Sequence, residues 1–148
     1  MAIHQFTLEA SWPGGRNEVG YIDAGHLQTK ISIPTEMDGP GVGTNPDEML
    51  LGAAATCYLI TMAAMMERAE LPLEHVGLSS VGDVDVTNGV FTYKRITHRP
   101  LVRLKKEASE EQLARAKKIA HQAETSCMIS RAIKGNVDIV LEEDININ

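Results

Sequence analysis

Two cysteines are the residues most able to do chemistry in this chain. Cys57 lies within an uncharged stretch from Met49 to Met66, and Cys127 lies far downstream. In a reducing compartment a cysteine pair is more often catalytic, metal-binding or inert than a permanent disulfide. Metal binding is the weakest of these readings, because the cysteines and histidines show no ligand-type spacing such as C-x-x-C or H-x-x-x-H. A reactive thiol pair and two inert, buried cysteines remain as alternatives.

The two cysteines are expected to differ in acidity. Cys127 begins a short helix predicted over residues 127–134, where free backbone N–H groups would stabilise a thiolate. Cys57 lies about three turns inside its helix, and apolar surroundings would raise its pKa. Cys57 therefore needs a nearby cation if it is to react as a thiolate.

The stretch around Cys57 has the length and boundaries of one helix. Asn45 suits the N-cap, Pro46 the first helical position, and Glu48 completes the spacing of a capping box; the helix should end before Pro72. Its 18 uncharged residues reach the lower limit for a membrane span. The richness in Ala and the lack of an aromatic belt or basic flank favour a buried helix instead. Because it is apolar on every side, we expect a second subunit to cover part of it.

The other elements predict an α+β protein. Alternating residues predict strands at 3–10, 16–24 and 27–34, joined as an antiparallel meander, followed by a loop at 35–45. A strand over 75–86, with four aliphatic residues on one face, leads through Asn88-Gly89 into a hairpin with 90–104. An amphipathic helix over 109–124, capped by Ser109, and a strand at 136–143 complete one domain over 1–148. The four aliphatic residues are Val76, Leu78, Val84 and Val86.

Composition and charge limit the classes of partner that this protein is expected to bind. The chain has 148 residues, 43% hydrophobic and 23% charged, as globular domains do. Its net charge of -6 and the lack of a dense Lys/Arg cluster argue against a nucleic-acid partner. The first residues lack the basic and apolar regions of a signal peptide, so we expect a cytoplasmic protein without a membrane partner.

Three segments resemble the OsmC/Ohr family of thiol-dependent peroxidases, the osmotically inducible protein C-like and organic hydroperoxide resistance proteins. These are "GTNPDEMLLGAAATC" from Gly43 to Cys57, "SCMISRAIKGNVDIVL" from Ser126 to Leu141, and "GGR" from Gly14 to Arg16. The order of elements is similar over essentially the whole chain. The resemblance implies an OsmC-like fold with antiparallel sheets, a central buried helix and an intertwined homodimer with sites at its interface.

The resemblance also implies a chemistry. Cys57 would attack the O–O bond of an organic hydroperoxide as a thiolate and become a sulfenic acid. Cys127 would then condense with it to form a disulfide, which an external dithiol reduces. Dihydrolipoyl groups are that reductant in the best-understood branch of the family, so a lipoyl protein is an expected partner. A peroxidatic and a resolving thiol suffice for this cycle, so no metal or organic cofactor is expected.

The activating cation that the resemblance implies is Arg16, oriented by an acid at the position of Asp47. Family members better known for this activity carry Glu at that position, so the neighbouring Glu48 could substitute for Asp47. Alternatively, both acids only complement the helix N-terminus. Ten residues separate Asp47 from Cys57, which places them about 15 Å apart along the helix and on different faces. The acid, or the arginine that bridges to it, is therefore expected from the second subunit.

Other readings of the same residues stay open. One is a dimer that binds a hydrophobic ligand, or senses oxidation, through the cysteine pocket without useful turnover. Another is a structural dimer with inert thiols. The joint presence of Cys57, Cys127 and Arg16 favours catalysis. A second departure from the family is Met128, where many members have Pro; this should leave the helix start more mobile.

Overall fold

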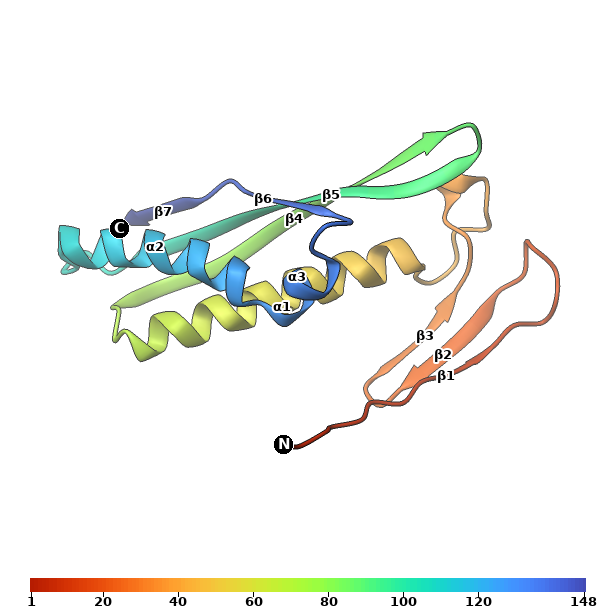
Figure 1. Ribbon diagram of the computed structural model, residues 1–148, viewed down its shortest axis with the longest axis horizontal. Helices are drawn as coiled ribbons and strands as arrows, with labels where there is room; N and C mark the ends of the chain where they lie inside the picture. Colours follow the sequence, from red (N-terminus) through yellow and green to blue (C-terminus); the bar gives the residue numbers. More distant parts are fainter. The chain divides into compact units, whose positions relative to one another are not determined.

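The computed structural model describes all residues from 1 to 148. The chain divides into two compact units, Met1–Met49 and Leu50–Asn148 (Figure 1). The expectation of a single domain over 1–148 stays a prediction.

The first unit contains a three-stranded antiparallel sheet. Strands β1 (Glu9–Ser11), β2 (Gly20–Ala24) and β3 (Leu27–Ile31) follow one another in that order, and a short 3-10 turn, η1 (Thr35–Met37), comes after them. The predicted meander is confirmed, but the bounds of all three strands were wrong, and the third ends at Ile31 and not at residue 34. Residues 3–8 are outside any strand, because β1 pairs with β2 over three residues only. The second strand begins at Gly20, where an added Cβ would lie 2.5 Å from the Ser11 carbonyl oxygen.

The second unit is built on a four-stranded sheet with a long central hairpin. Strands β4 (Leu73–Thr87) and β5 (Val90–Leu104) pair antiparallel along nearly their whole length. The turn between them places Asn88 at φ 52° and Gly89 at φ 75°, the left-handed pair that a type I′ hairpin turn requires. The hairpin predicted from Asn88-Gly89 is confirmed.

Two short strands run parallel to β5, which corrects the expectation of purely antiparallel sheets. They are β6 (Asp138–Leu141) and β7 (Asp144–Ile147), and they lie in the region where one strand at 136–143 was predicted. The helical segment between β5 and β6 carries the chain back along the sheet, so the next strand enters in the same direction as β5. Periodicity within a strand does not reveal such pairing.

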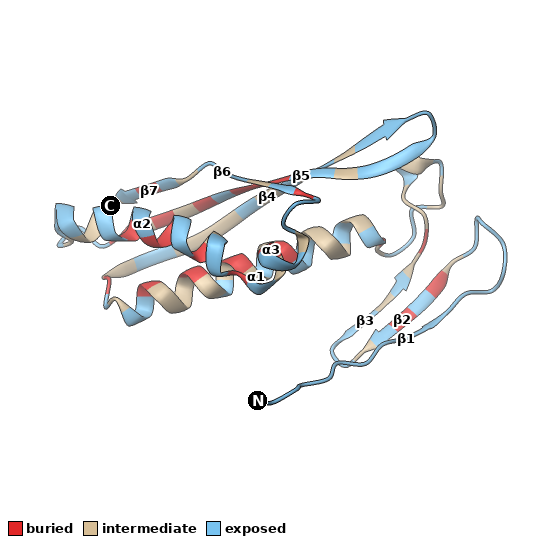
Figure 2. Cartoon of the chain, viewed as in Figure 1, coloured by how far each residue is buried: buried red, intermediate tan, exposed pale blue.

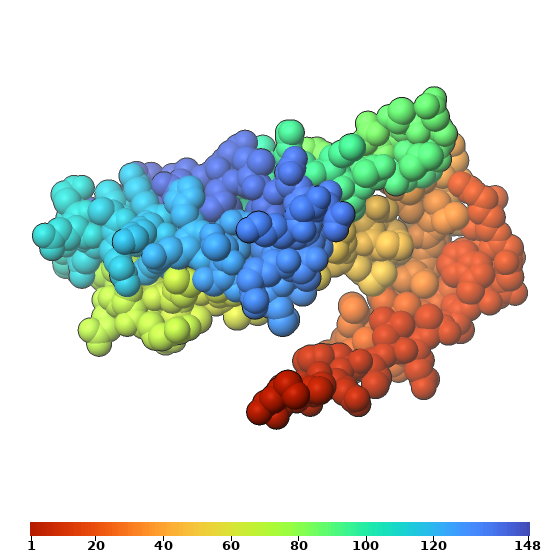
Figure 3. Space-filling view, viewed as in Figure 1, coloured from red at the N-terminus to blue at the C-terminus, as the bar shows by residue number.

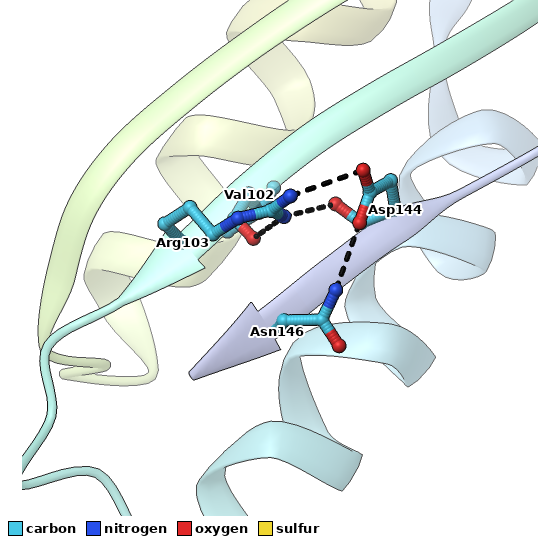
Figure 4. A network of polar contacts seen from close by, with 4 residues as sticks. All are labelled: Val102, Arg103, Asp144 and Asn146. Atoms are coloured by element: carbon cyan, nitrogen blue, oxygen red, sulfur yellow. Dashed lines mark hydrogen bonds and ion pairs between the residues drawn. The ribbon is translucent and has the colours of Figure 1, made fainter. Parts of the chain in front are cut away.

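Arg103 ties β7 to β5 (Figure 4). Its guanidinium donates to the carboxylate of Asp144 at 3.0 Å, to the Asp144 carbonyl at 3.0 Å and to the Val102 carbonyl at 3.1 Å. Asn146 donates to the other carboxylate oxygen at 2.8 Å. The hydrogen bond from Arg103 holds the pKa of Asp144 below its ordinary value. These contacts join the chain's last strand to the centre of the sheet.

Three helices complete the chain: α1 (Pro46–Arg68), α2 (Glu110–Ser126) and α3 (Met128–Ile133). The predicted N-caps are confirmed, because Asn45 Oδ1 accepts from the Glu48 amide at 2.9 Å and Ser109 forms a reciprocal capping box with Gln112. The Glu48 carboxylate accepts from the Thr44 hydroxyl, so the capping box expected between Asn45 and Glu48 is not confirmed. The helix predicted from 109 to 124 is amphipathic as expected, and its buried residues are Ala116, Ile119, Ala120 and Ala123.

The main core lies where α1 and α2 meet one face of the β4–β7 sheet (Figure 2). In the space-filling view, the atoms of α2 and α3 (blue) lie along those of α1 (yellow to green) (Figure 3). Val86 was predicted to share the buried face of its strand, but it is 57% exposed, beyond a bulge at Asp83/Val84 near the hairpin tip.

Within one chain α1 buries a single stripe and not its whole circumference. Its fully buried residues are Ala54, Tyr58, Met62 and Met66, each one turn after the last. By length and composition alone α1 would also suffice to cross a membrane, and 22% of its most apolar window is buried. Most of this apolar helix is therefore not buried by the second unit.

Candidate active site

Tyr58 sets the rotation of α1 and thereby the direction in which Cys57 points. The Tyr58 ring is fully buried and stacks on His98 of β5, with ring centroids 4.9 Å apart and planes 12° from parallel. Its hydroxyl donates to the Ala120 carbonyl of α2 at 2.9 Å, and burial holds its pKa well above the ordinary value. Because neighbouring helical residues differ by about 100° in direction, Cys57 lies beside this anchored face.

His98 is the second part of this anchor. Its side chain is fully buried, and its Nδ1 lies 2.7 Å from the Ser80 hydroxyl on the neighbouring strand. Burial lowers the pKa of His98, which favours the neutral ring. A neutral aromatic pair therefore fixes α1 against the sheet behind the cysteine.

Cys57 and Cys127 come together in the second unit although they are distant in sequence. Both are free thiols; Cys57 is half-buried and Cys127 is fully buried. Their sulfurs share a hydrogen bond that lowers the pKa of Cys57 and raises that of Cys127. Cys127 is thus the S–H donor, and Cys57 is the sulfur on which negative charge is favoured.

The difference in acidity is opposite to the one expected from the sequence. Burial raises the pKa of Cys57, but hydrogen bonds from Cys127, from the backbone amides of Ile129 and Met128, and from the Thr61 hydroxyl bring it below the ordinary value. The backbone amides at the start of α3 therefore serve Cys57, which lies on another helix. Four donors from the second unit lower the thiol's pKa, so a cation is not the sole means of activating Cys57.

Cys127 is the N-cap of α3 and therefore lies just before the helix, whereas the sequence predicted it as the first helical residue. Its sulfur accepts from the Ser130 amide at 3.5 Å. Burial and the neighbouring Cys57 nevertheless raise its pKa. The expectation of a stabilised thiolate at Cys127 was wrong, because desolvation and a neighbouring thiolate outweigh one helix end.

Met128→Pro removes one of these donors and should raise the pKa of Cys57. Proline has no N–H, but it is well tolerated at the first position of a helix. Cys127, at φ -59° and ψ 125°, already has the extended backbone that precedes a proline. We expect Cys57 alkylation below its titration midpoint to slow by about twofold to tenfold, the range for one net hydrogen bond of about 0.5–1.5 kcal/mol. A pH series of alkylation rates, with Cys127 replaced by Ser, measures the shift.

Met128→Ala is the matched control, because it removes the same side chain and keeps the backbone N–H. In this control, the pKa of Cys57 should equal that in the parent protein. An equal shift in both variants would attribute the effect to the Met128 side chain and contradict the assigned donor.

Arg16 lies in a loop of the first unit and not in the strand predicted from 16 to 24. Its exposed guanidinium donates to the backbone carbonyls of Met37 at 2.9 Å and Asp38 at 3.2 Å. The Trp12 indole N–H donates to the Gly15 carbonyl at 2.8 Å and closes the loop that precedes it. The loop position of Arg16 is thus held by backbone contacts.

The two acids stand in the first turn of α1. The Glu48 carboxylate accepts a hydrogen bond from the Thr44 hydroxyl at 2.8 Å. Arg16, Asp47 and Glu48 all belong to the first unit, and their roles toward Cys57 stay a prediction.

The sequence did not reveal several residues around the thiols. Thr61 follows Cys57 by one helical turn, and this spacing could have signalled its hydroxyl as a donor. The amides of Met128 and Ile129 carry no side-chain signal for a contact with another helix. No group of three or more His, Cys, Asp or Glu side chains is arranged to hold a metal ion.

Comparison with known proteins finds a family and several similar chains. The sequence model of the family described as "OsmC-like protein" matches residues 39–142. The uncharacterized protein YmaD of Bacillus subtilis is 62% identical over 147 residues, covering 99% of this chain and 98% of that protein. An organic hydroperoxide resistance protein of Xanthomonas axonopodis pv. citri is 28% identical over 139 residues, covering 92% of each chain.

The fold is also similar to that of solved structures. The crystal structure of an organic hydroperoxide resistance protein OsmC from Legionella pneumophila superimposes with a TM-score of 0.76 at 23% identity, covering 100% of this chain and 99% of that one. At this identity the likeness concerns the fold alone. The family match over residues 39–142, together with the α+β architecture, shows that this chain belongs to the family of OsmC-like proteins.

Proposed function

We propose that this protein is a cysteine-based, thiol-dependent peroxidase that reduces organic hydroperoxides. The observation that carries the proposal is the pairing of Cys57 with Cys127, in which hydrogen-bond donors favour the thiolate on Cys57 alone. A thiolate is the nucleophile in such chemistry, and a neighbouring thiol prevents overoxidation. The name of the Xanthomonas relative points to the same class of substrate.

The reaction begins with attack of the Cys57 thiolate on the O–O bond. The distal oxygen is transferred to sulfur, the alkoxide leaves and takes up a proton, and Cys57 becomes a sulfenic acid. Cys127 then attacks this sulfur and releases water, which leaves a disulfide between the two residues. An external dithiol, with dihydrolipoyl groups as the proposed class, restores both thiols by exchange.

Arg16 is proposed to place a positive charge beside the thiolate. Its guanidinium stays charged when desolvated and carries several donors in a fixed plane. Asp47, or Glu48 in its place, is proposed to orient it. This charge would add to the four donors of the second unit and favour the developing alkoxide during attack.

A steady-state assay with tert-butyl and lipid-like hydroperoxides tests the proposed function. Dithiol and monothiol reductants are compared at equal thiol concentration. We expect turnover with the dithiol and one equivalent of hydroperoxide consumed per pair of thiols without any reductant. Failure to oxidise the two thiols with a stoichiometric hydroperoxide would reject the proposal.

The alternative of an apolar ligand in the cysteine pocket is not supported by the cavity of about 400 Å³ beside α3. That cavity is lined by Ser130 and by residues that include Glu124, Arg131 and Lys134, but by neither cysteine. We keep the peroxidase, in the cytoplasm, as the proposed activity because the two thiols are paired.

The uncovered side of α1 supports a homodimer as the working form. Gly52, Ala53, Thr56 and Ile60 form an exposed stripe, and Ile60 is 68% exposed. Small residues in such a stripe allow close approach of another helix, and a large apolar area exposed to water favours association. A second copy of this chain is the proposed cover.

Ala53→Glu should therefore dissociate the dimer. Burying an unpaired carboxylate costs about 3 kcal/mol or more, so the association constant should fall by about 100-fold or more. Sedimentation over a dilution series measures the change. Ala114→Glu makes the same substitution at an exposed position of α2 and should leave association unchanged. If the Ala53→Glu protein remained a dimer, the stripe would not be part of the interface.

A further inference from the structure

Ser130 contacts the resolving cysteine through its amide and carries its hydroxyl beside the same residue. Its amide donates to the Cys127 sulfur at 3.5 Å, and its hydroxyl also favours the ionised form of that thiol. The residue is 4% exposed, and the Cys127 side chain is fully buried. Both residues are therefore buried, although Ser130 also lines the cavity of about 400 Å³ beside α3.

The Ser130 hydroxyl is also unsatisfied in the resting dithiol. Its Oγ is buried and has no hydrogen-bond partner of good geometry. Buried hydroxyls in folded proteins are normally paired, and an unpaired one destabilises the fold. A hydroxyl rotates freely, so it can turn toward the sulfur once that atom gains negative charge. Such a donor stabilises the charged state more than the resting state, which is the requirement for speeding a step.

We propose that Ser130 serves the resolving step, by donating hydrogen bonds to the Cys127 sulfur as this atom becomes the attacking thiolate. The inference rests on the proposed function for its biological meaning. In the resting state the S–H of Cys127 donates to the Cys57 thiolate; once Cys57 is oxidised to the neutral sulfenic acid, that acceptor loses its negative charge. Ser130 then stabilises the negative charge that develops on Cys127.

The step balances without another reactant. The Cys127 proton leaves the sulfur, the thiolate forms the S–S bond, and the S–O bond of the Cys57 sulfenic acid breaks. The departing hydroxide takes up one proton and becomes water. The hydroxyl of Ser130 is neither consumed nor changed.

Reaction with the disulfide reagent 5,5′-dithiobis(2-nitrobenzoate) separates this inference from peroxidase activity. Attack by Cys57 releases a first thionitrobenzoate and leaves a mixed disulfide. Attack by Cys127 on that mixed disulfide then releases a second thionitrobenzoate and forms the Cys57–Cys127 bond. The second release therefore reports the reactivity of Cys127 without any hydroperoxide.

Ser130→Ala should slow the second release by about tenfold at neutral pH, in line with loss of one hydrogen bond to a charged group. Its pH midpoint should move upward, while the rate of the first release stays unchanged. Ser126→Ala removes an exposed hydroxyl next to Cys127 and should match the parent in both phases. The melting temperature of Ser130→Ala should not fall, because the hydroxyl is unpaired in the resting state.

An unchanged second release in Ser130→Ala would overturn the inference. Equal slowing of both releases with a lower melting temperature would also overturn it, since that outcome marks a structural role. A Ser130-dependent second release in a protein that hydroperoxides do not oxidise would sustain the inference and reject the peroxidase.

Discussion

Replacing Cys57 by Ser is expected to reduce hydroperoxide consumption by at least about a thousandfold, the scale on which enzymes lose activity with their nucleophile. The hydroxyl of serine does not ionise at neutral pH, so the four donors around the Cys57 sulfur have no anion to stabilise. Loss of hydroperoxide, followed in the presence of a dithiol, measures the effect.

Cys127→Ser separates the nucleophile from the resolving thiol. This variant should consume one equivalent of hydroperoxide per chain and then stop as a sulfenic acid on Cys57, which a sulfenic-acid trap and mass spectrometry detect. The buried Cys127 carries the raised pKa of the pair, so it should not replace Cys57 as the first nucleophile. Normal turnover by Cys57→Ser would show that the two roles are assigned the wrong way round.

Arg16→Ala is expected to slow peroxide attack by about tenfold to a hundredfold, because charge-assisted hydrogen bonds contribute about 1.5–3 kcal/mol. It should also raise the pKa of Cys57. The decrease should fall short of that in Cys57→Ser, since the donors of the second unit remain. Alkylation and peroxide-reduction rates over a pH series, with Cys127 replaced by Ser, give both quantities.

Arg16→Ala removes the hydrogen bonds to the Met37 and Asp38 carbonyls as well as the positive charge. Two further variants are therefore needed to separate these two effects. Arg16→Lys keeps the charge and loses the planar donor set, so it should lie between the parent and Arg16→Ala. Lys30→Ala removes an exposed cation of the same unit and should leave Cys57 unchanged. If Cys57 reacted as fast in Arg16→Ala as in the parent protein, the hydrogen bonds around Cys57 would account for all of its activation.

Asp47→Ala should have a smaller effect than Arg16→Ala. A carboxylate orients the arginine but has the wrong sign of charge to stabilise a thiolate. Glu48 is adjacent and could take over part of the role, so Glu48→Ala should have its full effect only when combined with Asp47→Ala.

Local interactions allowed the sequence by itself to determine most helix boundaries and the central hairpin. Asn45 and Ser109 cap their helices through side chains that reach amides three residues ahead. Asn88 and Gly89 adopt the left-handed turn that few other pairs tolerate. The residue motifs around Cys57 and Cys127 likewise identified the family, because they are segments of contiguous chain.

Contacts between distant segments were decided only by the tertiary structure. The parallel pairing of β6 and β7 with β5 depends on where the α2–α3 connection returns the chain, which no strand periodicity records. The extent of β1 depends on how far its neighbour β2 reaches. Strand boundaries were accordingly less predictable than helix boundaries.

The acidity of the two thiols also depended partly on the local sequence and partly on the tertiary structure. The sequence placed Cys127 correctly at the start of a helix, but the Met128 and Ile129 amides of that helix stabilise charge on Cys57 of another helix. The pKa of each thiol depends on the balance between desolvation and the donors around it. That balance is set by packing, because the anchored Tyr58 turns Cys57 toward donors that are distant in the sequence.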